Sequence, residues 1–161
     1  WVSDITYIQL LDEYVYLAVI MEIFSRKCIG WDLGRNIDTR LTLNALNMAI
    51  SDRKSIGFCK LVHHSDQGVQ YASKDYVSWL KENRIRISMS RKGNVYDNAF
   101  AESFIKTLKA EEVNLNEYRT MEEAYDNIKE FIEKVYNKKR LHSSIGYVPP
   151  EEFEQKVLKL A

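Results

Sequence analysis

The segment YVYLAVIM at residues 14–21 decides the fold class, because it is a continuous run of apolar and aromatic residues. Such a run is typical of a central β-strand buried on both faces of a sheet, and it is far shorter than the ~20 residues of a membrane span. DITYIQL at residues 4–10 precedes it, and KCIGWDL at residues 27–33 follows it after a Ser25-Arg26 turn. The short connections predict that the three strands are antiparallel neighbours.

The next part of the chain alternates helices with strands. Thr39 and Ser73 are each expected to cap a helix. Residues 60–64 (KLVHH) and 84–88 (RIRIS) are each expected to form a strand. A polar loop at residues 90–98 then leads into a helix through about Glu112. Three antiparallel strands followed by this alternation predict an α/β fold with a mixed five-stranded sheet flanked by helices.

The C-terminal part is expected to be helical. Thr120 and Glu123 form a capping box ahead of a helical apolar stripe, and Pro150 suits the first turn of a last helix. We therefore predict an α/β core at residues 1–115 and a helical extension at residues 116–161, packed together as one domain.

The composition is that of a globular protein. The chain has 161 residues, 45% hydrophobic and 29% charged, with 23 basic and 23 acidic residues. Its two cysteines cannot form a zinc framework, and a reducing, cytoplasmic setting is the default expectation. No phosphate-binding glycine loop, dinucleotide fingerprint, zinc-protease or hydrolase-elbow motif occurs, which argues against those classes.

Three carboxylates occupy positions that suit a catalytic site. Asp4 lies in the first strand, Asp66 follows a predicted strand, and Glu102 lies in a helix with Lys106 and Lys109 on the same face. Ligands of open α/β sheets gather at strand ends. Each residue taken singly is as well explained by a turn, a helix cap or a surface Glu–Lys pair. The case therefore depends on the three together.

The spacing and the flanking motifs resemble a known family. Thirty-five residues separate Asp66 from Glu102, as in the Asp, Asp-35-Glu pattern of transposases and retroviral integrases. Four flanking motifs follow one another in an order that resembles bacterial insertion-sequence-3 transposases: DITYI, HSDQGVQYAS, SMSRKGNVYDNAFAESFIKTLKAE and YNKKRLHSSIGYVPPEEF. The resemblance covers residues 4–153 and implies a ribonuclease-H-like fold.

This resemblance also implies an activity. Asp4, Asp66 and Glu102 would be the catalytic triad and would hold Mg²⁺ or Mn²⁺. Two such ions would promote DNA cleavage and strand transfer. The implied partners are mobile-element ends, target DNA and further copies of the chain in a bacterial, nucleoid-associated complex. An upstream helix-turn-helix reader is expected from the family. The basic residues implied to contact DNA are Lys109, Lys106, Arg91 and Lys92.

Some residues and functions stay open at this level. His63 and His64 cannot chelate one ion, because adjacent strand residues point to opposite faces, although His64 could lie behind the metal site. Asn98 is most simply a helix cap, and no role is evident for Arg140 and His142. A nuclease without strand transfer and a non-catalytic DNA-binding relic are the two alternative functions.

Overall fold

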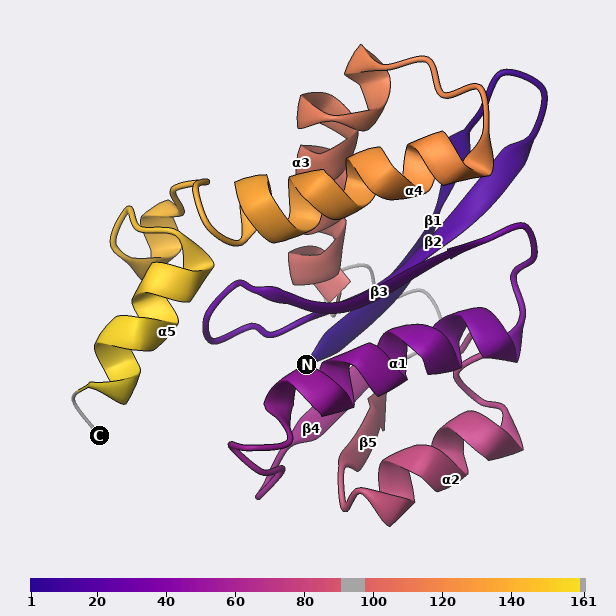
Figure 1. Ribbon diagram of the computed structural model, residues 1–161. Helices are drawn as coiled ribbons and strands as arrows, with labels where there is room; N and C mark the ends of the chain where they lie inside the picture. Colours follow the sequence, from indigo (N-terminus) through magenta and orange to yellow (C-terminus); the bar gives the residue numbers. More distant parts are fainter. Residues whose placement is uncertain (91–97, 160–161) are drawn as a thin grey trace.

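The computed structural model describes residues 1–90 and 98–159 (Figure 1). The elements are, in chain order, β1 (Val2–Gln9), β2 (Tyr14–Met21), β3 (Cys28–Gly34), α1 (Thr39–Arg53), β4 (Val62–Ser65), α2 (Lys74–Glu82), β5 (Arg86–Met89), α3 (Ala99–Glu111), η2 (Val113–Leu115), α4 (Met121–Glu130), η3 (Phe131–Tyr136), η4 (Ser143–Ile145) and α5 (Pro150–Leu158). Within the described residues, no helix combines the length and the apolar character that crossing a membrane requires.

The sheet has the predicted mixed topology. Its five strands have the order β3-β2-β1-β4-β5, with β1, β2 and β3 antiparallel and β4 and β5 parallel to β1. β2 has the predicted bounds. β4 and β5 each begin two residues later than predicted, because Lys60 and Arg84 adopt left-handed φ angles of 60° and 59°. A left-handed residue reverses the chain and cannot extend a strand.

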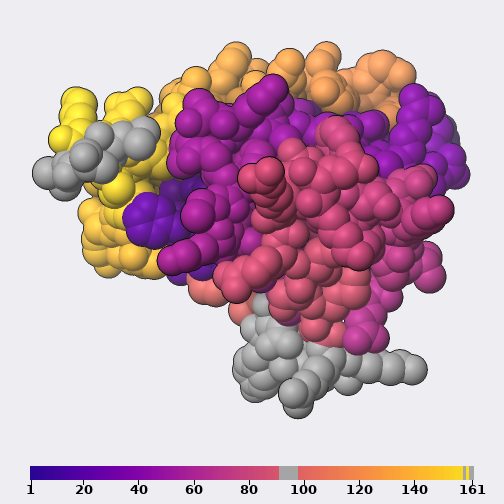
Figure 2. All heavy atoms as spheres, turned by 90° about the horizontal axis from the view of Figure 1, so that it is seen from below, coloured from indigo at the N-terminus to yellow at the C-terminus, as the bar shows by residue number. Residues whose placement is uncertain are grey.

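Helices cover both faces of the sheet, as predicted (Figure 1). Val15, Leu17 and Val19 of β2 join the core under α3 and α4, whereas Ala18 and Ile20 join the core under α1 and α2. Period-two alternation with both faces buried explains why β2 is apolar along its length. Seen from below the view of Figure 1, α1 and α2 form one continuous surface (Figure 2).

Helix α1 packs closely on β3 at Gly30. A Cβ atom at this position would lie 2.2 Å from the carbonyl oxygen of Ala45. The N-cap of α1 lies one residue earlier than predicted, because it is Asp38 and not Thr39. Oδ1 of Asp38 accepts a hydrogen bond from the backbone N–H of Leu41 at 2.9 Å. A carboxylate cap also stabilises the positive end of the helix dipole.

The other two predicted caps are present. Ser73 Oγ accepts from the N–H of Tyr76, and Thr120 Oγ1 accepts from the N–H of Glu123. The Glu123 carboxylate accepts in return from the N–H of Arg119. The helical stripe that follows is divided, because α4 passes into a π-helical turn at η3.

The C-terminal segment is tied to β3 and α1. The side-chain amide of Asn137 pairs with the backbone of Cys28, accepting from its N–H at 3.0 Å and donating to its carbonyl at 2.9 Å. Arg53 is buried between Glu22 and Glu154, which joins α1 to α5. Figure 1 shows α5 lying to one side of the sheet, beyond the end of α4.

Candidate active site

The first two candidate carboxylates lie on neighbouring parallel segments. Val2 of β1 pairs with His64 of β4, so Asp4 and Asp66 lie at the same level, two residues further along each chain. The N–H of His64 donates to the carbonyl of Trp1 at 2.8 Å, which fixes this register. Asp4 is half-buried, and Asp66 is exposed directly after the last residue of β4. The structure therefore brings these two predicted site residues together at the end of a strand.

The third candidate, Glu102, lies in the first turn of α3. The start of this helix is attached to β1, because the side-chain amide of Asn98 donates to the carbonyl of Ser3 at 3.0 Å. Asn98 stands at the N-cap position but makes no capping hydrogen bond, so the capping role expected from the sequence is wrong. Its side chain holds the helix against the residue before Asp4.

Asp4 has a perturbed pKa. Burial raises the pKa of Asp4 to about 6, against the hydrogen bond from the Ile5 N–H, and the negative charges of Asp66 and Glu102 raise it further. Like charges at close range disfavour a further ionised carboxylate. Perturbed carboxyl groups of this kind concentrate at functional sites.

Two of the carboxylates are held by backbone amides. Oδ1 of Asp4 accepts from the N–H of Ile5 at 2.9 Å, and Oδ1 of Asp66 accepts from the N–H of Gly68 at 2.9 Å. A Cβ atom at position 68 would lie 2.9 Å from the Asp66 carboxylate, so a larger residue there would displace the Asp66 side chain. Across residues 1–90 and 98–159, no three His, Cys, Asp or Glu side chains converge closely enough to form a ready-made metal cluster.

The two histidines of β4 have structural partners. His63 is fully buried, hydrogen-bonds the hydroxyl of Tyr76 at 3.0 Å, and has its pKa lowered to about 3 by burial. Both ring nitrogens of His64 lie 2.8 Å from hydroxyl oxygens, those of Ser88 and Ser90. His64 therefore has no free nitrogen for a metal ion, and it clamps β4 to β5 behind Asp66.

The basic residues expected to contact DNA fall into two groups. Lys106 is exposed on α3, and Lys109 places its Nζ 4.1 Å from the ring centroid of the exposed Tyr7. Burial of part of its side chain lowers the pKa of Lys109. Arg91 and Lys92 lie outside the described residues.

Sequence reasoning missed the residues that support the candidate carboxylates. Tyr7, Gly68 and the Ser3–Asn98 hydrogen bond were not expected, and each depends on a contact that residue type and periodicity do not specify. The Gly68 position alone had a local signal, since glycine two residues after a strand-end aspartate is typical of a tight turn.

Comparison with known proteins decides the family. Residues 1–95 match a family described as "Integrase core domain", and residues 83–150 match a second family with the same description. The chain belongs to the integrase core domain family.

Named relatives of this integrase core domain are bacterial transposases. The chain is 42% identical over 155 residues to the transposase for insertion sequence element IS904 of Lactococcus lactis subsp. lactis, covering 96% of this chain and 60% of that protein. It is 39% identical over 158 residues to transposase InsF for insertion sequence IS3A of Escherichia coli, covering 98% of this chain and 54% of that protein. The resemblance found in the sequence is confirmed, and the chain spans little more than half the length of these relatives.

Solved structures confirm the fold of this integrase core domain. The catalytic core domain of HTLV-2 integrase, determined in complex with magnesium in a trimeric form, superimposes with a TM-score of 0.68 at 16% identity. The superposition covers 95% of this chain and 93% of that one. The predicted ribonuclease-H-like α/β fold is therefore confirmed.

Proposed function

We propose that this chain is the catalytic core of a DNA transposase that cuts mobile-element ends and joins them to target DNA. The observation that supports the proposal is the pairing of β1 with β4: Val2 pairs with His64, and Asp4 and Asp66 each follow two residues later at the same strand end. The hydrogen bond from Asn98 to the Ser3 carbonyl also attaches the start of α3, the helix of Glu102, beside Asp4 in this integrase core domain. We further propose residues 1–115 as the catalytic core and residues 116–161 as its helical extension.

The carboxylates suit Mg²⁺ or Mn²⁺, two ions of which we propose for the working site. Carboxylate oxygens are the ligands that these hard cations prefer. Burial is the main cause of the raised pKa of Asp4, and the negative charges of Asp66 and Glu102 add to it. A bound cation would favour the ionised carboxylates, and Asp4, Asp66 and Glu102 would hold it. Bound there, divalent ions supply Lewis-acid activation of the attacking and leaving oxygens of a phosphodiester.

The chain's own groups would position the DNA. Lys109 lies two helical turns beyond Glu102 on α3, and Lys106 lies between them, so an exposed basic face follows the catalytic carboxylate along the helix. Ammonium groups neutralise backbone phosphates and fix a duplex without reading its bases. We extend this role to Arg91 and Lys92 from the sequence alone.

The proposed partners follow from the same relatives. The named transposases are bacterial, which leads us to propose chromosomal and mobile-element DNA as substrates, at the nucleoid in the cytoplasm. The HTLV-2 integrase catalytic core was determined in a trimeric form, and we propose that this chain also works as a homo-oligomer.

The test is a joining assay with a pre-cut DNA end. With Mn²⁺ the chain should nick duplex DNA and join the pre-cut end to a target, and EDTA should abolish both. Asp66→Asn should lose both activities, whereas Asp126→Asn, on the exposed face of α4, should keep them. Nicking without joining would identify a nuclease, and DNA binding with neither activity would identify a non-catalytic relic.

A further inference from the structure

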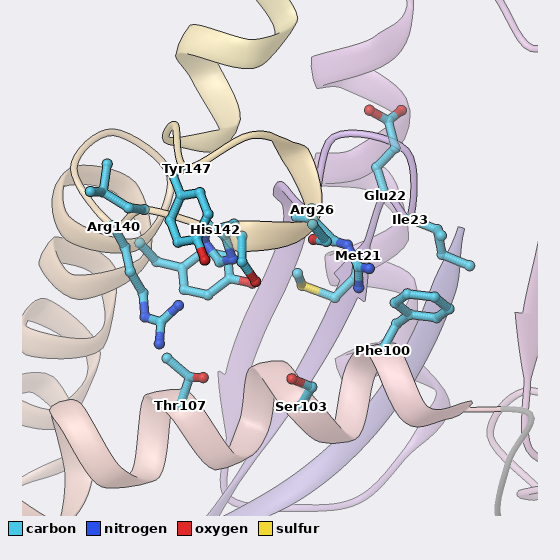
Figure 3. Close-up of a pocket in the computed structure, with 14 residues that line it drawn as sticks. Met21, Glu22, Ile23, Arg26, Phe100, Ser103, Thr107, Arg140, His142 and Tyr147 are labelled. Atoms are coloured by element: carbon cyan, nitrogen blue, oxygen red, sulfur yellow. The ribbon is translucent and has the colours of Figure 1, made fainter.

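A cavity of about 570 Å³ lies beside α3, between that helix, the turn after β2 and the segment that follows η3 (Figure 3). Phe100, Ser103 and Thr107 line it from α3, on a different face from Glu102. The other side is formed by the C-terminal segment around η4, which contributes His142 and Tyr147. The cavity therefore joins the helix that carries Glu102 to the C-terminal motif for which the sequence indicated no role.

Two arginines give the cavity a positive charge. Arg26 lies with its guanidinium carbon 4.2 Å from the ring centroid of Phe100, and within the described part of the chain it has no carboxylate partner. Arg140 is fixed by a bidentate pair with Glu111 at 2.8–3.0 Å. The one acidic residue that lines the cavity, Glu22, is committed to Arg53 at 3.0 Å. Among the described residues that line the cavity, Arg26 is thus the cation without a carboxylate partner.

His142 adds an unused polar atom. Its Nε2 is buried and, within residues 1–90 and 98–159, has no hydrogen-bond partner. The ring packs edge-on against Tyr136, with centroids 4.8 Å apart. Burial lowers the pKa of His142, and the charges of Arg140 and Arg26 lower it further, so the field of both arginines reaches the imidazole. A buried ring nitrogen left unpaired is costly, and a ligand that pairs with it relieves the cost.

The hydroxyl groups around these residues complete the donor set. Ser103 and Thr107 lie one turn apart on α3, and Figure 3 shows both hydroxyl oxygens on the side of the helix that faces Arg26 and Arg140. Ser143 and Ser144 line the cavity from η4. Guanidinium and hydroxyl donors around a polar hollow are the groups that bind phosphate oxygens.

We propose that this cavity binds a backbone phosphate of DNA, with Arg26, His142 and the α3 hydroxyls as its partners. The inference rests on the proposed function, and it adds a second DNA contact, on the opposite side of α3 from Lys109. A strand seated there follows the helix toward the turn that carries Glu102. Free phosphate has the same chemistry, and the two sources are separated below.

The first test observes His142 directly. The chain has three histidines; Nε2 of His63 bonds Tyr76 inside the core, and both ring nitrogens of His64 bond serine hydroxyls, so neither ring lines the cavity. In metal-free buffer, a duplex of about 20 base pairs should shift the ¹⁵N signal of His142 Nε2 at micromolar concentration. Inorganic phosphate should give that shift only at millimolar concentration. DNA binding that leaves the His142 signal unchanged, or an equal response to both ligands at equal concentration, would overturn the proposal.

The second test measures the salt dependence of duplex binding. Arg26→Gln should weaken binding about 5–10-fold near 0.1 M salt and reduce the slope of log K against log salt by about 1. Arg26→Lys should recover most of the affinity. Arg84→Gln is the control, because Arg84 has a left-handed φ of 59°, close to the 64° of Arg26, and it is exposed, two residues before β5, and is not among the residues that line the cavity. Equal slopes for Arg26→Gln and wild type would refute the assignment.

These measurements use no metal and no catalysis. Phosphate binding in the cavity can therefore be detected even if the chain neither nicks nor joins DNA, and nicking and joining can be detected even if the cavity binds no phosphate. The two proposals can thus be refuted separately.

Discussion

The side-chain amide of Asn98 donates a 3.0 Å hydrogen bond to the backbone carbonyl of Ser3, across 95 positions of the chain. This bond attaches the first residue of the α3 turn to the strand residue that precedes Asp4. Glu102 lies four residues later, one helical turn into α3. The separation between two candidate catalytic carboxylates therefore depends on an uncharged side chain.

Replacing Asn98 should loosen the site more than the fold. Asn98→Ala removes the donor and leaves the Ser3 carbonyl unpaired, which should cost about 1 kcal/mol of unfolding free energy. We expect a larger effect on divalent-metal affinity, a fall of about tenfold measured by calorimetry, because Glu102 loses its fixed distance from Asp4. The control is Asn116→Ala, whose amide donates to the carbonyl of Glu112 away from the site. Unchanged metal affinity in Asn98→Ala would contradict this reading.

The raised pKa of Asp4 predicts how the metal-free protein responds to pH. From pH 3.8 to about 6 the folded state binds more protons at Asp4 than the unfolded state does. The contribution of Asp4 to stability is therefore present below pH 3.8 and is lost as pH rises through about 6. Asp4→Asn does not titrate, so in EDTA it should be more stable than wild type by about 1–3 kcal/mol at pH 7.5 and by much less at pH 4.

The measurement is urea unfolding of both proteins at several pH values. His63, with a pKa near 3, acts in the opposite direction between pH 3 and 6.5, since its folded form binds fewer protons. That contribution is common to both proteins and cancels in their difference. If the difference in unfolding free energy between Asp4→Asn and wild type is equal at pH 4 and pH 7.5, ionisation of Asp4 does not destabilise the folded state.

Divalent cations should stabilise the protein through the same carboxylates. Mg²⁺ or Mn²⁺ at about 100 times its dissociation constant adds about 2.7 kcal/mol, seen as a rise in Tm. Asp66→Asn should melt higher than wild type without metal, because one repelling charge is gone, and should respond less to Mn²⁺. An Mn²⁺ response equal to that of wild type would remove Asp66 from the ligand set.

Lys109 and Tyr7 form a cation–π pair at the exposed side of α3. Lys109→Ala should weaken duplex binding about 5–10-fold near 0.1 M salt and lower the salt slope by about 1, while stability changes by under about 1 kcal/mol. Tyr7→Leu should keep the charge but lose the position of the ammonium, so joining should fall more than binding. Tyr7→Phe retains the ring and should restore joining. Lys81→Ala, exposed on α2, serves as the control.

The ion pairs of Arg53 should carry much of the attachment of α5. The Arg53 side chain is only 7% exposed and pairs with Glu22 and Glu154. Arg53→Met leaves Glu22 without its cation and Glu154 with Lys27 alone, and it should cost about 3 kcal/mol of unfolding free energy. Arg35→Met breaks an exposed pair with Glu13 and should cost under about 1 kcal/mol. Equal costs for the two variants in urea unfolding would contradict the structural role of the Arg53 network.

The sequence determined those features that depend on neighbours along the chain. The apolar run of β2 could be assigned with its bounds because hydrophobic alternation is a property of adjacent residues. The Ser73 and Thr120 caps were evident because a cap bonds a backbone N–H three residues away. Asp4, Asp66 and Glu102 were identified by their spacing and flanking motifs, which needed no coordinates.

Only the tertiary structure decided which distant groups meet. The left-handed residues Lys60 and Arg84 shorten two strands, and Asn98 bonds Ser3 in place of capping its own helix. Tyr7 comes to face Lys109, and Arg26 comes to face the cavity that His142 lines, through the same packing of α3 on the sheet. These contacts depend on the angle and position at which helices pack on the sheet. The order of residues along the chain does not specify that packing geometry. The sequence therefore names the candidate site residues, and the packing of the sheet and helices sets the distances between them.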